Sequence, residues 1–199
     1  MKDKKNGYIY YEYHEKSEKE VISETAWKSV FHWLYVIVGV LFVFFVAWMM
    51  FFHIISVDGD SMLPTLRDND KLFVYTFNYT PEQGDIIVIS MPEYEDYLLV
   101  KRVIAFENQT VDVDYNSGTV TVDGKVLDEK YASAMNVRSD NEIAYPYTVP
   151  NGCVFVMGDN RNESRDSRSR GIGCIDENRI VGKALFRISF SSDRNIYDQ

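Results

Sequence analysis

Ser61 stands in the stretch VDGDSMLPTL, residues 57–66, shortly after a long apolar run. A serine nucleophile needs a neighbouring base, and histidine is the base most often used. Every histidine lies at or before position 53, at His14, His32 and His53. A Ser-His-Asp arrangement in the later part of the chain would therefore require His53 to fold back from the apolar run.

The cysteines are two, Cys153 and Cys174. With no histidine nearby, neither a zinc site nor a catalytic thiolate is favoured. No loop has the spacing of an EF-hand, so we expect no metal and no cofactor. The two cysteines could form a disulfide in an oxidising compartment or remain free thiols, and the sequence leaves both open.

Lys101 is the remaining candidate base. It lies within LLVKRVIAF, residues 98–106, a strongly apolar segment with the composition of a strand. Burial disfavours the charged ammonium and lowers the pKa of a lysine, which leaves neutral amine to accept a proton. A lone lysine in a strand would otherwise extend to the surface or pair with an acid.

The apolar run before Ser61 is the first element that would position these residues. Residues 33–52 contain 20 consecutive residues without a charge, enough to cross a bilayer as a helix. We expect a cytoplasmic tail over residues 1–29 and a transmembrane helix over 30–55, with the N-terminus inside. A cleaved secretory signal is the alternative, but its apolar core is usually shorter and closer to the N-terminus.

After the helix the pattern changes to short β-branched and aromatic stretches separated by turn residues. The expected fold is mainly β: a single N-terminal transmembrane helix followed by an extracytoplasmic β domain with a small inserted subdomain. We expect a catalytic β core over residues 56–105, an inserted subdomain over 106–150 and the second part of the core over 151–199.

The charge distribution excludes one class of function. The chain has a formal net charge of -9, and residues 56–199 carry 15 Lys or Arg against 24 Asp or Glu. Nucleic-acid binding needs clustered Lys and Arg to contact phosphates. We therefore expect no nucleic-acid partner.

Four separate stretches, in order, resemble the motifs of bacterial type I signal peptidases, with a Gram-positive character. They are SMLPTL at 61–66, GDIIVI at 84–89, VKRVIA at 100–105 and GDNRNESRDSR at 158–168. Together with the preceding apolar run, they are far more specific than a single SMxPT would be. The resemblance implies a β domain of the signal peptidase type.

The resemblance also implies roles for individual residues. Ser61 matches the nucleophile and Lys101 the general base of a Ser/Lys dyad. Ser164 matches the serine that hydrogen-bonds the lysine, and Asp166 with Arg168 match a supporting ion pair.

Two further expectations concern the surroundings of the dyad. Gly59 stands where other family members have a serine that helps to hold the oxyanion, so the backbone N–H of Ser61 would remain as donor. Family substrates carry small residues, typically Ala, at the first and third positions before the cut, which implies shallow apolar pockets. Five residues could line these pockets or belong to the core: Val57, Met62, Leu63, Ile86 and Val88.

The activity that the resemblance implies is removal of N-terminal signal peptides from exported preproteins. The implied partners are these preproteins, the lipid bilayer and the secretion translocase. The implied location is the cytoplasmic membrane of a bacterium, crossed once, with the catalytic domain on its outer face.

Two alternatives stay open. The chain could be a catalytically silent, membrane-anchored binding subunit of a secretion complex, or a specialised peptidase for pilin or conjugation precursors with the same chemistry. A soluble self-cleaving repressor also uses a Ser-Lys pair, but the apolar run and the missing basic domain argue against it.

Overall fold

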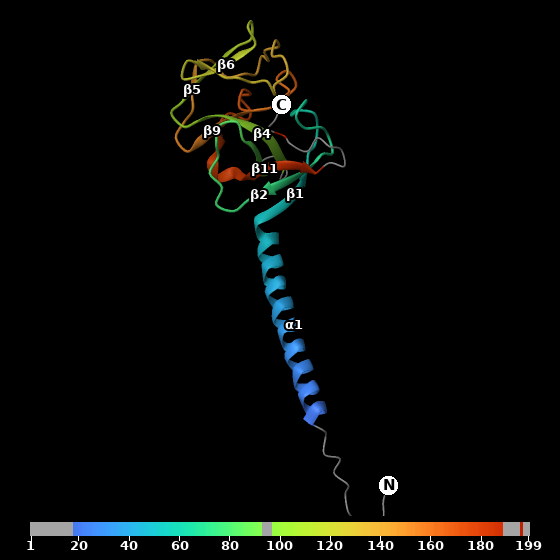
Figure 1. The fold of residues 1–199 in the computed structure, drawn as a ribbon. Coiled ribbons are helices and arrows are strands. Elements are labelled where there is room, and N and C mark those ends of the chain that lie inside the picture. Colours follow the sequence, from blue (N-terminus) through green and yellow to red (C-terminus); the bar gives the residue numbers. More distant parts are fainter. Residues whose placement is uncertain (1–17, 93–96, 189–195, 197–199) are drawn as a thin grey trace, which may run out of the picture. The chain divides into compact units, whose positions relative to one another are not determined.

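The computed structural model describes residues 18–92, 97–188 and 196 (Figure 1). By internal contacts, the chain divides into two compact units, Met1–Trp48 and Met49–Gln199. Most of the expected cytoplasmic tail, residues 1–17, lies outside the described residues.

One long helix, α1, covers Glu18–Phe51. Its segment Ala26–Phe51 has a mean hydropathy of 2.6 and is long enough to cross a membrane. The helix ends at Phe51 rather than at the expected residue 55. The sequence FHIIS that follows is rich in β-branched and aromatic side chains, and it forms strand β1, Phe52–Ser56.

The larger sheet of the second unit has seven antiparallel strands in the order β1-β2-β11-β3-β4-β9-β10. The remaining six are β2 (Lys71–Tyr75), β3 (Ile86–Met91), β4 (Tyr97–Phe106), β9 (Cys153–Met157), β10 (Ile175–Asp176) and β11 (Ile180–Ile188). A short 3-10 helix, η2 (Glu177–Arg179), joins β10 to β11. The first and last described strands, β1 and β11, thus flank β2 and each pairs with it.

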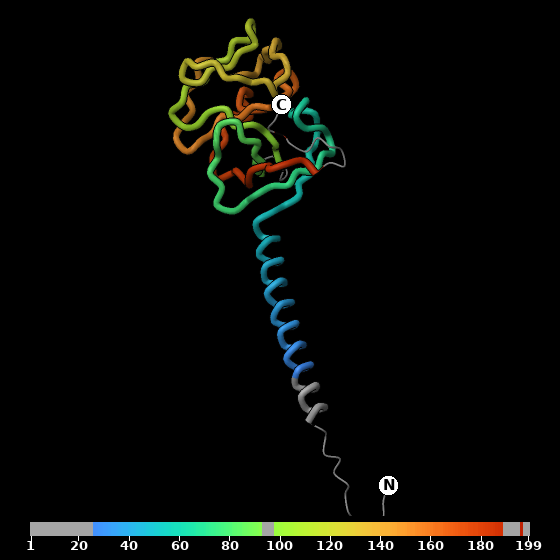
Figure 2. Tube along the Cα trace, viewed as in Figure 1, coloured from blue at the N-terminus to red at the C-terminus, as the bar shows by residue number. Residues whose placement is uncertain are grey.

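A second sheet lies between β4 and β9 in the sequence (Figure 2). Its order is β7-β6-β5-β8, formed by β5 (Thr110–Asp114), β6 (Thr119–Val122), β7 (Lys125–Val126) and β8 (Tyr147–Thr148). Asp123 and Gly124, with φ of 52° and 75°, make the tight turn between β6 and β7. All four strands fall within residues 106–150, the proposed inserted subdomain.

Strand β3 shows how the core is built. Its sequence IIVISM is apolar without alternation, which is typical of a strand covered on both faces. Ile86 and Val88 pack into one hydrophobic cluster with Met62 and Leu66, whereas Ile87 and Ile89 pack into another on the opposite face. The mainly β fold with one N-terminal helix is confirmed.

Candidate active site

Ser61 lies in a turn that precedes β2 and is anchored by buried apolar side chains. Met62 and Leu66 are 1% and 0% exposed, and the N–H of Leu66 donates to the carbonyl of Met62 over 2.9 Å. Gly59 has φ of 83°, a conformation that favours glycine, and its N–H donates to Oδ1 of Asp68. These contacts fix the path of the chain on both sides of Ser61.

Lys101 projects from the middle of β4, where it pairs with Ile87 of β3. Its Nζ lies 2.6 Å from Oγ of Ser61 and 2.9 Å from the carbonyl oxygen of Val100. The residue is only 2% exposed. The structure therefore brings the expected nucleophile and the expected base into direct hydrogen-bond contact across 40 positions of sequence.

Burial sets the protonation of this lysine. It lowers the pKa of Lys101 from 10.5 to about 8, with the nearby charge of Arg168 acting in the same direction. The carboxylates of Asp166 and Asp159 oppose the fall but do not cancel it. Near neutral pH the neutral amine, which a general base requires, is thus a minor form but a far more populated one than in an exposed lysine.

The expected ion pair is formed and buried. Nε and Nη2 of Arg168 each donate to a different oxygen of Asp166, both over 2.9 Å. Burial disfavours the Asp166 carboxylate, but the Arg168 charge and the N–H of Gly158 outweigh it, so the pKa of Asp166 lies below its ordinary value.

Ser164 differs from its expected arrangement. Its buried Oγ does not bond to Lys101, which donates to Ser61 and Val100 instead. The hydroxyl faces Asp166 and helps to lower the pKa of that carboxyl. The hydroxyl lies against Gly158, where an added Cβ would come within 2.2 Å of it. A role for Ser164 in orienting the lysine stays a prediction.

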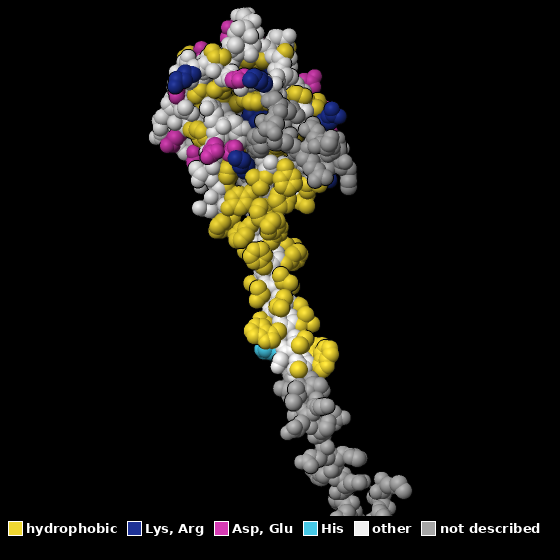
Figure 3. Space-filling model, viewed as in Figure 1, with side chains coloured by type: hydrophobic (Ala, Val, Ile, Leu, Met, Phe, Trp, Pro, Cys, Tyr) yellow, Lys and Arg dark blue, Asp and Glu magenta, His cyan; other side chains and the backbone are white. Residues whose placement is uncertain are grey.

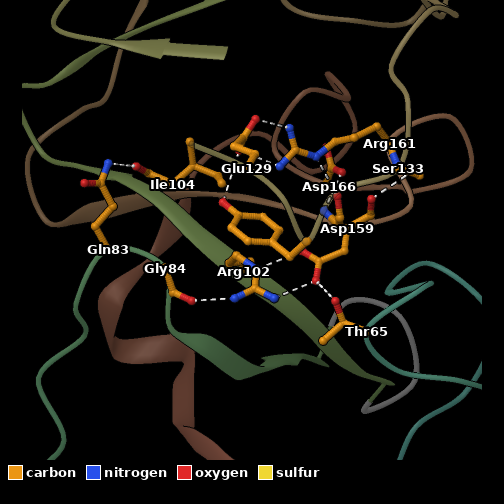
Figure 4. Close-up of polar contacts among 12 residues, drawn as sticks. Thr65, Gln83, Gly84, Arg102, Ile104, Glu129, Ser133, Asp159, Arg161 and Asp166 are labelled. Carbon is orange, nitrogen blue, oxygen red and sulfur yellow. Dashed lines mark hydrogen bonds and ion pairs between the residues drawn. The ribbon is translucent and has the colours of Figure 1, made fainter. Parts of the chain in front are cut away.

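A buried polar network lies next to the dyad, and no role was predicted for its members (Figure 4). Arg102, which follows Lys101 on β4, donates from Nε and Nη2 to the two carboxylate oxygens of Asp159 at 2.9 and 2.6 Å. The hydroxyl of Thr65 donates to the same carboxylate over 2.5 Å. Arg102 and Asp159 have side-chain exposures of 3% and 0%. The turn that carries Ser61 and the strand that carries Lys101 are therefore both tied to Asp159.

The signal for this network was present in the quoted motifs. Thr65 belongs to SMLPTL, Arg102 to VKRVIA and Asp159 to GDNR. Charged residues this close to a buried lysine could have been expected to need partners of their own, because unpaired buried charges are costly.

A cavity of about 460 Å³ opens beside Ser61 and Lys101. Its other lining residues are Val57, Asp58, Gly59, Asp60, Met91, Leu98, Leu99, Val100, Glu163, Arg165 and Ile172. Of the five side chains expected to line pockets or the core, Val57 alone borders this cavity. Met62, Ile86 and Val88 are core side chains, since each is at most 1% exposed, and Leu63 is half-buried outside the lining.

The structure also locates the potential metal ligands and the two cysteines. No group of three or more His, Cys, Asp or Glu that could hold a metal ion occurs within residues 18–92, 97–188 and 196. Cys153 and Cys174 are free thiols that pack against the same hydrophobic cluster. Burial, followed by a hydrogen bond with Cys174, raises the pKa of Cys153 to about 11, which keeps this thiol protonated.

Comparison with protein families gives one matching family, described as signal peptidase, peptidase S26, over residues 30–189. Several similar proteins are named signal peptidases. Signal peptidase I of Bacillus licheniformis is 36% identical over 79% of this chain and 88% of its own length. The probable signal peptidase I-1 of Synechocystis is 43% identical over 66% of this chain and 68% of its own.

Staphylococcus aureus signal peptidase IB is 32% identical over 80% of this chain and 90% of its own length. Among solved structures, a signal peptidase I from Enterococcus faecalis is 31% identical and has a TM-score of 0.42. That similarity covers 53% of this chain and 97% of the solved one.

Proposed function

Because the chain belongs to the signal peptidase family, peptidase S26, we propose that it is a membrane-bound endopeptidase that removes signal peptides from exported preproteins with a Ser61/Lys101 dyad. The observation that carries this proposal is the 2.6 Å contact between Nζ of Lys101 and Oγ of Ser61. The lowered pKa of Lys101 supports the direction of proton transfer, from the serine hydroxyl to a neutral amine.

The reaction proceeds through an acyl-enzyme. Lys101 takes the hydroxyl proton as Ser61 attacks the scissile carbonyl, and the resulting ammonium gives that proton to the leaving amine. Neutral again, Lys101 takes a proton from a water as that water attacks the ester, and it then gives this proton to Oγ of Ser61 as the acid product leaves. The developing oxyanion is held by the backbone N–H of Ser61.

Substrate is bound in the cavity beside the dyad. Val57, Leu99 and Ile172 contribute apolar surface there, next to the reacting hydroxyl. Such surface suits small side chains such as those of an Ala-x-Ala site, which are bound mainly by contact area. Charged residues at the edge, including Asp58 and Glu163, remain exposed to solvent.

The catalytic unit acts at the membrane surface. Strand β1 begins at Phe52, directly after the segment long enough to cross a membrane. Hydrophobic side chains gather over β1, β2 and β11 (Figure 3), and Ile54, Phe186 and Ile188 are 64%, 40% and 40% exposed there. This apolar face lies against lipid, on the outer side of a bacterial cytoplasmic membrane whose inner side holds the N-terminus.

The first test is cleavage of a purified preprotein carrying an Ala-x-Ala site by the whole protein in detergent. The parent is expected to cut after the last Ala, and Ser61→Ala and Lys101→Ala are expected to lose at least about 1,000-fold in kcat. Lys130→Gln is the matched control, because Lys130 pairs with Asp128 on the surface and both side chains are about three-quarters exposed.

A folded parent that is inert on several such preproteins contradicts the proposal and favours a silent binding subunit. Full activity of either dyad variant contradicts the Ser/Lys mechanism. Cleavage of pilin or conjugation precursors alone would keep the chemistry and assign the specialised substrate class.

A further inference from the structure

Residues 129–133, in the connection between β7 and β8, contact the residues around the dyad through three side chains. We call these three side chains, Glu129, Tyr131 and Ser133, the brace. Glu129 binds Arg161, and Tyr131 lies against Arg102 on the strand of Lys101. Ser133 bonds to Asp159, whose carboxylate accepts from Thr65 in the turn of Ser61. No role for the brace follows from the sequence motifs, since it lies in the irregular part of the inserted subdomain.

The strongest of these contacts is the pair between Glu129 and Arg161. Nη1 and Nη2 of Arg161 donate to the two oxygens of Glu129 at 2.7 and 2.6 Å. The Glu129 side chain is 10% exposed and the Arg161 side chain 1% exposed, so the pair is almost fully removed from water. A bidentate pair of this kind fixes both the position and the plane of the guanidinium.

Arg161 in turn bonds to the main chain next to Ser61. Its Nε donates to the carbonyl of Gly158 over 3.0 Å. An added Cβ at Gly158 would lie 2.4 Å from the carbonyl oxygen of Ser61, so the two backbones are in close contact. Two residues further on, the N–H of Asn160 donates to that same Ser61 oxygen over 3.0 Å.

Ser133 holds the same main chain from another direction. Its N–H donates to the carbonyl of Asp159 over 2.8 Å, and its Oγ accepts from the N–H of Arg161 over 2.9 Å. The ring of Tyr131 lies 3.8 Å below the guanidinium carbon of Arg102, which holds the Asp159 carboxylate. The brace is therefore bonded to the main chain of Asp159 and Arg161 and contacts the guanidinium groups of Arg102 and Arg161 (Figure 4).

We propose that the brace positions Ser61 for attack, with Glu129 acting through Arg161 and Gly158 on the backbone of the nucleophile. This inference rests on the proposed peptidase function. Glu129 is a positioning residue, because it touches neither Ser61 nor Lys101. Small displacements of a nucleophile slow the chemical step by up to about 100-fold without weakening substrate binding.

The test compares Glu129→Gln, Arg161→Lys and Ser133→Ala with the parent in the preprotein assay, far below the melting temperature of each variant. Glu129→Gln removes the charge but keeps the shape, and Arg161→Lys keeps the charge but cannot hold Glu129 and Gly158 together. Both are expected to lower kcat by about 10- to 100-fold, with KM changed less than about twofold. Ser133→Ala is milder and folds even if the charge variants do not; it is expected to lower kcat about threefold to tenfold.

Lys130→Gln, within the same segment but on the surface, controls for a change of sequence and is expected to keep the parent's kcat. If the variants melt at lower temperature but keep kcat, or if KM rises while kcat is constant, the positioning role is wrong. If the parent does not cleave, the proposed function and this inference both fail. If the parent cleaves and the variants keep its kcat, only this inference fails.

Discussion

Lys101 and Arg102 are neighbours on β4, yet their side chains are bound on opposite faces of the strand. Lys101 contacts Oγ of Ser61, and Arg102 pairs with Asp159, which also accepts from Thr65. One strand therefore carries the proposed base on one side and the support of the nucleophile's turn on the other. A one-residue slip in β4 would exchange the two environments, so the register with β3 is decisive.

The Arg102–Asp159 pair is expected to be essential for stability. Asp159→Ala would remove the carboxylate that accepts from two nitrogens of the buried Arg102 guanidinium, and breaking a buried pair of this kind typically costs about 3–5 kcal/mol. Urea unfolding of the whole protein in detergent measures this loss. The control is Asp128→Ala, whose partner Lys130 is exposed, and its midpoint should stay at the parent's value. An unchanged midpoint for Asp159→Ala would show that the pair has no net role.

Gly158→Ala is expected to abolish most of the activity. A Cβ at this position would lie 2.2 Å from Oγ of Ser164 and 2.4 Å from the carbonyl oxygen of Ser61, and backbone cannot yield as a flexible side chain does. We expect kcat to fall at least about 100-fold. Gly171→Ala is the matched control, because the nearest atom to its Cβ is Oγ of Ser169 at 3.8 Å. Equal activity of the two variants would contradict the close packing of Gly158 against Ser61.

The pKa of Lys101 predicts the pH dependence of cleavage. With a pKa of about 8, the neutral fraction rises tenfold per pH unit below that value and levels off above it. The value of kcat/KM should follow the same curve between about pH 6 and pH 10. An apparent pKa near 10.5 would mean that the lysine is solvated during catalysis, and a flat profile would exclude it as the base.

The parts that sequence predicted well depend on short-range patterns. The charge-free run predicted the helix, and the quoted motifs pointed to Ser61 and Lys101, whose side chains lie in contact. The sequence could not predict which apolar residues line the cavity, because an apolar residue that faces a cavity and one that packs against another strand show the same hydrophobic pattern. Ile86 and Val88 were therefore candidates for a substrate pocket although both are fully buried.

The motifs could not predict which charged residues pair across long stretches of the sequence. Arg102 and Asp159 are 57 positions apart, and Glu129 and Arg161 are 32 apart. Both pairs form only because β9 returns beside β4 after the inserted strands, and no local periodicity records that return. The end of α1 at Phe51 was missed for a related reason, since the pairing of FHIIS with β2 is what converts an apolar continuation into a strand.

Replacing the buried lysine should stabilise the fold while it removes activity. The unfolded chain binds its lysine proton up to a pKa of about 10.5 and the folded protein only up to about 8, so the parent's stability rises with pH between these values. Below pH 8 the buried charge costs on the order of 3 kcal/mol at most, since each pKa unit corresponds to about 1.4 kcal/mol. Lys101→Met is therefore expected to unfold at a higher urea concentration than the parent at pH 7, and the difference between the two midpoints should shrink towards pH 10.5. A difference that is absent at pH 7, or that widens with pH, would contradict the lowered pKa.

The exposed apolar face of β1 and β11 predicts a difference between lipid and detergent. Ile54→Ser and Phe186→Ser remove exposed apolar surface without entering the cavity, so cleavage of a soluble peptide in detergent should be unchanged. In vesicles of bacterial lipids, we expect cleavage of an inserted preprotein to fall by about threefold to tenfold, because the catalytic unit would no longer rest on the acyl chains. Val126→Ser, an equally exposed apolar position on β7 of the second sheet, is the control for lost apolar surface. If all three variants behave alike in vesicles, the face of β1 and β11 has no special contact with lipid, and the apolar segment Ala26–Phe51 suffices to place the dyad.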